Sequence, residues 1–508
     1  MIPMTVGRIA EVVGGTLHDV DDPDAEITGT VEFDSRRIQR GGLFLALPGA
    51  TSDGHDHAAA AIAAGAVAVV AARPVGVPAI VVPPVQVGDD NTLALEHDTD
   101  GSGAAVLAAL GTLARHVVDV LTEDGLTVVG VTGSAGKTST KDLIAAVLEP
   151  LGPVVAPPGS FNNELGHPWT ALRADRQTRF LVLEMSARGR GHIAALARIA
   201  PPRIGAVLNV GTAHLGEFGS REAIARTKGE LVEALPTATD GGVAILNADD
   251  TLVAEMAGRT RARVVTVGAT AAADVAATDV RLDDRACARY TLVVRDPATG
   301  TEVQAPVQLT VHGEHQVGNS LTAVAVALEC GATAEQAAAA VSAAGAVSAH
   351  RMAVHTRGDG ITVIDDAYNA NPDSMRAGLK ALATMARGGD RPRRTFAVLG
   401  EMMELGDDSV VEHDLIGRLA VRLDITRIIA VGATRPVRGL FQGAVMEGSW
   451  GEEASHVPDP AAALALLREE LRPGDIVLVK ASQSVGLWTV ADELLGDSGT
   501  AVGTEAAR

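Results

Sequence analysis

Residues 130–142 carry the pattern in this chain that points most directly to chemistry: Gly-Val-Thr-Gly-Ser-Ala-Gly-Lys-Thr-Ser-Thr-Lys-Asp. The apolar run before them predicts a buried strand, and residues 143–148 predict a helix. A glycine-rich turn between a strand and a helix can close backbone N–H groups around phosphate oxygens. Lys137 could then reach the terminal phosphates of a nucleoside triphosphate, and the Thr138 hydroxyl suits Mg²⁺.

The glycine spacing departs from the usual phosphate-binding loop. That pattern requires a glycine at position 131, where this chain has Val131, and the glycines fall instead at 130, 133 and 136. The alternative is an ordinary strand–turn–helix segment that contains Gly-Lys-Thr by chance. We favour a phosphate-binding loop for ATP, made of Gly133, Ser134, Ala135, Gly136, Lys137, Thr138 and Ser139.

Two further polar residues follow predicted strands. Glu184 ends the apolar run 180–183, and His214 lies in a loop after the run 204–208. In parallel sheets, ligands bind beyond the carboxyl ends of the strands. A carboxylate, an imidazole and the Thr138 hydroxyl could share Mg²⁺ ions that also bind ATP phosphates. The alternative is that both residues only cap a helix or tether a loop.

Two asparagines and a lysine are less specific. Asn162 and Asn163 offer neutral donors to a phosphate or a peptide carbonyl, although the pair could equally form an Asx turn. Lys228 lies on a predicted helix, and a helix lysine is usually solvated, so the position alone predicts a surface residue.

A second group of polar residues lies near a predicted strand late in the chain. Two adjacent carboxylates, an aromatic ring and two amides follow the strand directly, and this set suits a ribose and a base: Asp365, Asp366, Tyr368, Asn369 and Asn371. The alternative is a helix N-cap followed by a turn. Arg351 starts this unit and Lys480 ends its last predicted strand, and either could be only a surface ion-pair partner.

The order of predicted elements indicates an α/β protein of three domains. Short apolar runs alternate with helical stretches, which is typical of a mostly parallel sheet covered by helices. We also expect an alanine-rich helix at 57–72 and a β insertion at 281–311. The predicted units are an N-terminal substrate domain (1–87), an acidic linker (88–103), a central P-loop domain (104–347) and a C-terminal Rossmann-like domain (348–508).

Composition limits the function further. The net charge of −21 and the aromatic content of 2% disfavour nucleic-acid binding, which needs basic patches and stacking surfaces. The two cysteines give no disulfide framework or zinc spacing. No signal segment is evident, and the longest apolar run is short for a membrane span. We expect a cytoplasmic monomer that does not insert into membranes.

The combination of these motifs resembles the Mur ligase family, ATP-dependent amide ligases that build the peptidoglycan precursor. The stretches that carry the resemblance cover nearly the whole chain: the displaced glycine spacing, Asp34-Ser-Arg, Asn162-Asn-Glu-Leu-Gly, Glu184-Met, Asn209-Val-Gly-Thr-Ala-His-Leu, Lys228, Asp366-Ala-Tyr-Asn-Ala-Asn-Pro and Gly400-Glu-Met-Met-Glu-Leu-Gly. One departure is His350, which stands where the family commonly has glycine.

The resemblance implies a role for each residue. Lys137, Thr138, Glu184 and His214 would hold ATP phosphates and Mg²⁺, and a carbamate on Lys228 could support a second ion. Around the nucleotide would lie Asn319, Arg351, Asp366, Tyr368 and Asn369. The sugar–peptide substrate would contact Ser35 and Arg36 through its uridine diphosphate, and Asn162, Asn163, Ser186 and Arg188 elsewhere.

The resemblance also implies the reaction, which is the addition of D-alanyl-D-alanine to UDP-N-acetylmuramoyl-tripeptide through an acyl phosphate. The Asp-Asn-Pro-Arg run of the diamino-acid-adding relative is absent. Two ligase alternatives stay open, a diamino acid added to a shorter precursor or glutamate added to a folate. A third alternative, from a different class, is a P-loop regulatory ATPase.

Overall fold

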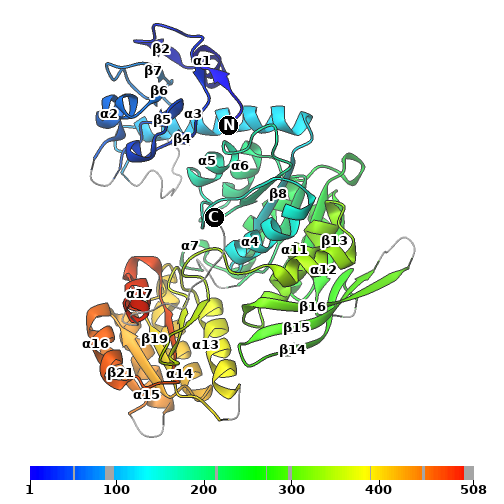
Figure 1. Ribbon diagram of the computed structural model, residues 1–508, viewed down its shortest axis with the longest axis vertical. Coiled ribbons are helices and arrows are strands. Elements are labelled where there is room, and N and C mark those ends of the chain that lie inside the picture. The colour runs from blue at the N-terminus through cyan, green and yellow to red at the C-terminus, as the bar shows by residue number, and fades with distance from the viewer. Residues whose placement is uncertain are drawn as a thin grey trace.

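The computed structural model describes residues 1–49, 52–85, 97–211, 215–270, 272–295, 300–388, 391–448 and 452–496. Three α/β domains follow one another along the chain, from the blue domain at the top of Figure 1 to the yellow and red domain at the bottom. The α/β class and the three-domain architecture that the sequence predicts are therefore confirmed. Two of the predictions, His214 and residues 88–96 of the acidic segment, lie outside the described residues.

The first domain is built on a small mixed sheet. Its strands lie in the order β2 (Thr16–His18), β7 (Ala79–Val81), β6 (Ala66–Ala71), β5 (Gly42–Leu45) and β4 (Val31–Glu32). A two-stranded pair, β1 (Met4–Thr5) and β3 (Glu26–Ile27), and the helices α1 (Val6–Val13) and α2 (Ala58–Ala63) complete it.

The helix expected at 57–72 is wrong in its second half. Helix α2 ends at Ala63, and Gly65 turns the chain with a φ of 115°, in the region that favours glycine. The next residues, Ala-Val-Ala-Val-Val-Ala, form the almost fully buried strand β6. β-Branched side chains suit a strand that is covered on both faces, and this preference outweighs the helical propensity of the alanines.

The central domain is a nine-stranded sheet in which β8 (Thr127–Thr132) is the third strand from the β9 edge. Strands β10 (Phe180–Glu184) and β11 (Ile204–Val207) pair with β8 in parallel on its two sides. Helix α4 (Lys137–Leu148) begins directly after the glycine-rich loop, earlier than the predicted residue 143, and packs against α11 (Gln316–Glu329). The remaining strands are β9 (Val154–Val155), β12 (Val243–Asn247), β13 (Arg263–Gly268), β14 (Val275–Leu282), β15 (Cys287–Arg295) and β16 (Glu302–His312).

The expected β insertion at 281–311 is part of this same sheet. Strand β13 pairs with β14 in parallel, and β15 and β16 then extend the sheet in antiparallel fashion. Helix α12 (Ala334–Ala343) packs on β16. The buried faces of these strands belong to the same hydrophobic cluster as β8 and α4, so the segment completes the central core.

The third domain has the Rossmann-like form that the sequence predicts. Its strand order is β17 (Ala353–Thr356), β18 (Thr362–Asp365), β22 (Ile476–Lys480), β19 (Thr395–Leu399), β20 (Arg427–Val431) and β21 (Ala454–Val457). Apart from the antiparallel edge strand β17, these strands are parallel. The helices are α13 (Pro372–Arg387), α14 (Ser409–Arg422), α15 (Arg435–Glu447), α16 (Pro460–Glu470) and α17 (Trp488–Gly496).

The long helix α3 (Ser102–Glu123) crosses from the first domain to the second (Figure 1). Among the described helices it alone is long and apolar enough to cross a membrane, and 67% of its most apolar window is buried inside the protein. It packs on α1 of the first domain and on α5 (Gly166–Ala171) of the second. Its apolar character is therefore explained by internal packing.

Candidate active site

A cavity of about 1400 Å³ lies where the central and third domains meet. The carboxyl ends of β8, β10 and β11 face it from the central domain, as expected for a parallel sheet. The lining includes the phosphate-binding loop from Ser134 to Ser139, five other predicted residues of the central domain and the four predicted residues of the third domain. These are Ser134, Ala135, Gly136, Lys137, Thr138, Ser139, Asn162, Asn163, Ser186, Arg188, Asn319, Arg351, Asp366, Tyr368 and Asn369.

The phosphate-binding loop is bonded by one asparagine and closely approached by another. Asn209, just after β11, makes two hydrogen bonds to the backbone of Ala135. Its Oδ1 accepts from Ala135 N at 2.9 Å, and its Nδ2 donates to Ala135 O at 3.1 Å. Gly136 has a φ of 83°, and a Cβ there would lie 2.7 Å from Asn319 Oδ1. The loop and α11 therefore approach so closely that only glycine can occupy position 136 without strain.

Lys137 projects from the first turn of α4 toward the loop. Its Nζ donates to the carbonyl oxygen of Gly133 at 2.8 Å. Burial and the positive charge of Arg351 lower the pKa of Lys137, and the carboxylate of Glu184 partly opposes this shift. The loop thus presents an ammonium group in a poorly solvated place, where an anion would be bound strongly.

Glu184 ends β10 and is fully buried. Its Oε2 accepts from Asn162 Nδ2 at 3.2 Å, whereas Oε1 has no hydrogen-bond partner among the described residues. Burial raises the pKa of Glu184, and the charges of Lys137 and Arg351 counteract this effect. A buried carboxylate oxygen without a partner is costly unless a cation or a donor reaches it, so Glu184 fits a metal ligand.

Lys228 is buried, contrary to the surface position that its helix predicts. It is the last residue of α8 (Arg221–Lys228), and 5% of its surface is exposed. Burial and then the charge of Lys137 lower its pKa well below the usual value. The described part of the chain offers it no hydrogen bond or ion pair. An amine in such a place is more easily kept neutral, and neutral amines are nucleophilic.

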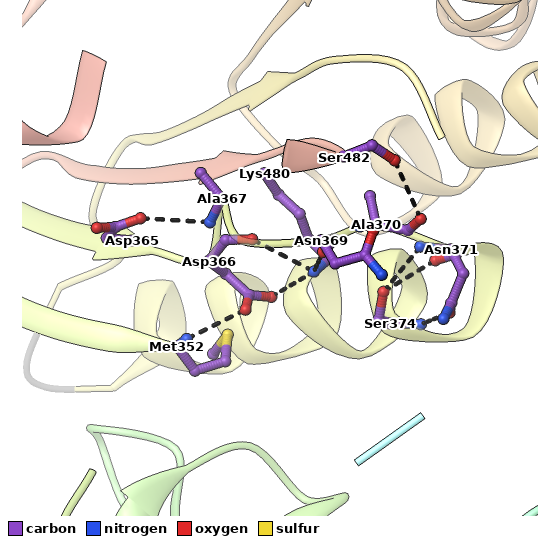
Figure 2. A network of polar contacts seen from close by, with 10 residues as sticks. All are labelled: Met352, Asp365, Asp366, Ala367, Asn369, Ala370, Asn371, Ser374, Lys480 and Ser482. Atoms are coloured by element: carbon purple, nitrogen blue, oxygen red, sulfur yellow. Dashed lines mark hydrogen bonds and ion pairs between the residues drawn. The ribbon is translucent and has the colours of Figure 1, made fainter. Parts of the chain in front are cut away.

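The third domain contributes a buried ion pair, shown in Figure 2. Lys480 Nζ donates to Asp366 Oδ2 at 2.6 Å and to Asn369 O at 2.9 Å. Met352 N donates to the other carboxylate oxygen of Asp366 at 3.1 Å. The expectation that Lys480 could be a surface residue is therefore wrong, because the side chain is buried and its Nζ fixes the loop after the neighbouring strand β18.

Arg351 reaches across the cavity from the connection between the two domains. Its guanidinium lies 4.2 Å above the centre of the Tyr368 ring, and Nη2 donates to Ser160 Oγ at 2.7 Å. The residues on either side, His350 and Met352, have φ angles of 57° and 50°. The left-handed backbone at His350 fits a position where glycine is favoured. Arg351 is thus a bridging residue and not a surface one.

Of the predicted sugar–peptide residues in the cavity, Asn163 and Ser186 bond within the central domain, whereas Arg188 bonds to the third domain. Asn163 Oδ1 accepts from Gly166 N at 2.9 Å, which is the local turn considered as its alternative, although the residue also lines the cavity. Ser186 Oγ donates to Asn162 O at 3.0 Å. Arg188 donates to Glu404 of the third domain at 2.6 Å. This ion pair joins the two domains across the cavity.

Ser35 and Arg36 lie apart from this cavity. They begin a short 3₁₀ helix (Ser35–Arg37) in the first domain, where the Arg36 side chain is exposed and pairs with Asp34. The Arg36 guanidinium holds the pKa of Asp34 low, at about 2. Phe33, two residues earlier, does line the cavity. The structure therefore brings the segment near the cavity but does not place these two side chains in it.

Sequence reasoning missed Ser160. This residue contacts both Thr138 and Arg351, and it lies in the loop that precedes the predicted pair Asn162 and Asn163. Its position two residues before Asn162 is the signal that could have identified it. Serine alone carries too little chemistry to be selected from a sequence.

Comparison with known proteins gives a consistent result. Three family models match the chain: the Mur ligase middle domain over residues 131–327, the Mur ligase glutamate ligase domain over 350–483, and the Mur ligase family catalytic domain over 28–116. A UDP-N-acetylmuramoyl-tripeptide–D-alanyl-D-alanine ligase of Mycobacterium leprae is 62% identical over 98% of this chain and 99% of its own length. The ligase of that name from Bacillus subtilis is 31% identical, over 97% and 99%.

Solved structures agree with these relatives. A crystal structure of MurF from Acinetobacter baumannii has a TM-score of 0.79 and 29% identity, and it covers 97% of this chain and 99% of its own. MurF ligase from Thermotoga maritima, crystallised with ADP, has a TM-score of 0.72 and 26% identity, over 93% and 98%.

Proposed function

The chain belongs to the Mur ligase family, and we propose that it joins D-alanyl-D-alanine to a UDP-N-acetylmuramoyl tripeptide with cleavage of ATP. The observation that carries this assignment is the 62% identity to ligases of that name along nearly the whole length of both chains. The cavity supports it, because groups suited to phosphates, to a cation and to a peptide face one another there.

The reaction needs two steps because a carboxylate is a poor acyl donor. The carboxylate oxygen of the tripeptide attacks the γ-phosphorus of ATP, the bond from that phosphorus to the ADP oxygen breaks, and an acyl phosphate and ADP are formed. The amine nitrogen of D-alanyl-D-alanine then attacks the acyl carbon, phosphate leaves, and the amine gives up a proton. Catalysis of such transfers depends on positioning and charge neutralisation. Lys137 would supply one positive charge beside the phosphates.

The residues present fit Mg²⁺, and the buried Oε1 of Glu184, which lacks a partner among the described residues, is the observation that supports this fit. Thr138 and Glu184 would hold the ion, together with His214 as the family resemblance implies. When bound, the ion neutralises phosphate charge. We further propose a carbamate on Lys228, which would turn a buried amine into an anion close to Lys137.

The nucleotide would lie between the two domains. In this proposal the loop from Gly133 to Ser139 holds the phosphates, and Asn319 approaches the adenine. Arg351, Asp366, Tyr368 and Asn369 cover the nucleotide from the third domain. Lys480 fixes the loop after β18, which carries the last three of them. Water would hydrolyse an acyl phosphate, so we expect residues 348–495 to close on the central domain when ATP binds.

The other half of the cavity would take the sugar–peptide substrate. Asn162, Asn163, Ser186 and Arg188 line it, and we propose that Ser35 and Arg36 hold the uridine diphosphate from the first domain. We also propose the domain limits predicted from the sequence. We further propose that the protein is a monomer located in the cytoplasm. A precursor that carries a nucleotide and a reaction that uses ATP both suit the cytoplasm.

A competition assay tests the acceptor. Purified protein receives ATP, Mg²⁺, and equal concentrations of D-alanyl-D-alanine, L-lysine and meso-diaminopimelate, with either the tripeptide or the dipeptide nucleotide precursor. We expect mass spectrometry to show only the tripeptide extended by D-alanyl-D-alanine. A diamino acid added to the dipeptide would favour the neighbouring ligase. Slow hydrolysis of ATP without any amide product would favour a regulatory ATPase.

A further inference from the structure

The hydroxyl of Ser160 lies between the phosphate-binding loop and the third domain. Its Oγ is 2.7 Å from Thr138 Oγ1 and also 2.7 Å from Arg351 Nη2. Thr138 and Ser160 belong to the central domain, whereas Arg351 begins the third. We infer that Ser160 is a positioning residue, which couples occupancy of the phosphate-binding loop to the placement of Arg351. This inference rests on the proposed function only in taking ATP as the nucleotide.

The donors and acceptors allow two arrangements, because either hydroxyl of the Thr138–Ser160 pair can donate, and the one in which Thr138 donates suits cation binding by Thr138. A guanidinium can only donate, so Ser160 Oγ accepts from Arg351. A serine oxygen has two lone pairs, and the second can accept the hydrogen of the Thr138 hydroxyl. Thr138 would then keep its own lone pairs free for a cation. One serine thus orients a hydroxyl of the phosphate-binding loop and holds an arginine of the other domain.

Arg351 depends on this contact more than an ordinary surface arginine would. Its Nε is buried and has no hydrogen-bond partner among the described residues. The guanidinium is held by Ser160 and by stacking on Tyr368. Of these two contacts, the one with Ser160 comes from the central domain, because Tyr368 moves with the third domain. Loss of the serine hydroxyl should therefore release Arg351 from the phosphate-binding loop.

The position of Arg351 in the chain strengthens the coupling. The residue lies in the connection between α12 and β17, between two residues in left-handed conformation. Such backbone is adopted only where the surroundings enforce it. A guanidinium fixed at this connection constrains the direction in which the third domain leaves the central one. Ser160 would therefore influence the domain arrangement as well as the nucleotide.

ATP binding without any peptide substrate tests the inference, with isothermal titration calorimetry as the measurement. We expect Ser160→Ala to weaken ATP binding about tenfold, the effect of losing a hydrogen bond to a charged group. Ser160→Thr keeps the hydroxyl and should stay within about twofold of the unmodified protein. Ser455→Ala, on the distant edge strand β21, serves as the matched control.

A double-mutant cycle separates coupling from a local packing defect. In the Arg351→Ala background, Ser160→Ala should have little further effect, because the two residues act through one bond. Small-angle scattering without ligand should show a more extended protein for Ser160→Ala than for Ser160→Thr. The inference is wrong if Ser160→Ala binds ATP as tightly as the unmodified protein, or if the two substitutions add fully. Neither outcome depends on which acceptor the enzyme uses, so the acceptor assay can fail independently.

Discussion

Lys137 Nζ donates to the carbonyl oxygen of Gly133, 2.8 Å away, so the lysine folds back over the loop from which it projects. The ammonium is thereby held close to the backbone N–H groups that would surround phosphate oxygens. Burial lowers its pKa, and a phosphate anion would stabilise the charged form. This geometry leads to the first prediction.

Lys137→Ala should lower the rate of ADP release by at least about 10²–10³-fold, the usual effect of losing one charge-stabilising group. Thermal unfolding should change little, because the substitution removes the hydrogen bond from Nζ to Gly133 O and leaves the backbone of the loop intact. A coupled assay for ADP measures the rate, and Lys380→Ala on the exposed face of α13 is the control. Turnover within tenfold of the unmodified protein would exclude this role.

Lys228→Ala should inactivate the enzyme, and short carboxylates such as formate or acetate should restore part of the activity. The reason is that a carbamate is an anion, which a small carboxylate can replace in the space left by the side chain. Intact-mass measurement in bicarbonate should show the added mass of about 44 Da that carbamylation produces, one CO₂ per chain. A free amine in fully active protein supplied with bicarbonate would contradict the proposal.

Substitutions of His350 should separate backbone strain from side-chain bonding. His350 has a φ of 57°, and its Nδ1 lies 2.6 Å from Asp365 Oδ2. His350→Ala loses that bond and keeps the left-handed backbone, whereas His350→Gly loses the bond and relieves the backbone. We expect the glycine variant to be more stable than the alanine variant by about 1 kcal/mol, measured by thermal unfolding. Equal stabilities would show that the backbone here carries no strain.

His413 should make the protein less stable in mild acid. Its Nδ1 is 2.6 Å from Ser409 O, so this nitrogen carries the hydrogen, and Nε2 accepts from Met402 N at 2.9 Å. Burial lowers the pKa of His413. Below the usual pKa of about 6.5, the unfolded chain therefore takes up a proton that the folded protein resists. Because the unfolded state then binds more protons, stability falls as the pH drops.

Urea unfolding at pH 7.5, 6.5 and 5.5 measures this effect. The slope that His413 contributes below pH 6.5 can reach about 1.4 kcal/mol per pH unit. His413→Gln should reduce the loss of stability between pH 6.5 and 5.5, even if the variant is less stable at pH 7.5. An identical loss in both proteins would assign the acid sensitivity to other groups.

A close backbone approach between domains gives a prediction about closure. Gly216, in α7 (Leu215–Phe218), faces Gly406 of the third domain, and a Cβ on Gly216 would lie 2.5 Å from Gly406 N. Gly216→Ala should hold the domains apart and slow ligation by about 10–100-fold, as expected for a small misplacement of reacting groups. Gly258→Ala has open space for its Cβ and is the control. Unchanged ligation would show that this approach is not needed for catalysis.

The sequence alone predicts a site residue correctly wherever the local hydrophobic pattern and the chemistry of the side chain indicate the same place. The phosphate-binding loop, Glu184 at the end of β10 and Asp366 after β18 all follow buried strands, and parallel strands bring such ends together. The strand at 66–71 is harder to predict because alanine-rich segments satisfy helix and strand patterns alike, and the boundary between the two elements is marked only by Gly65.

The remaining site residues depend on tertiary contacts that no local pattern specifies. Lys228 and Lys480 are of a residue type that is usually exposed, yet both are buried, because distant elements cover them. Ser160 owes its place to two contacts, 22 and 191 residues away in the chain. The first contact is set by the folding of the central domain and the second by the docking of the third domain, and a single sequence contains no local signal for either.

The placement of Arg351 in the connection between domains has a consequence for the order of release. A residue in the connection has a short lever arm, so rotation of the third domain about it displaces Arg351 little. Glu404 lies beyond β19 and pairs with Arg188. It lies farther from the connection, so the same rotation would displace it more than Arg351. Partial opening would thus uncover the peptide half of the cavity while the nucleotide half stays shut. On this geometry we expect the extended peptide product to leave before ADP.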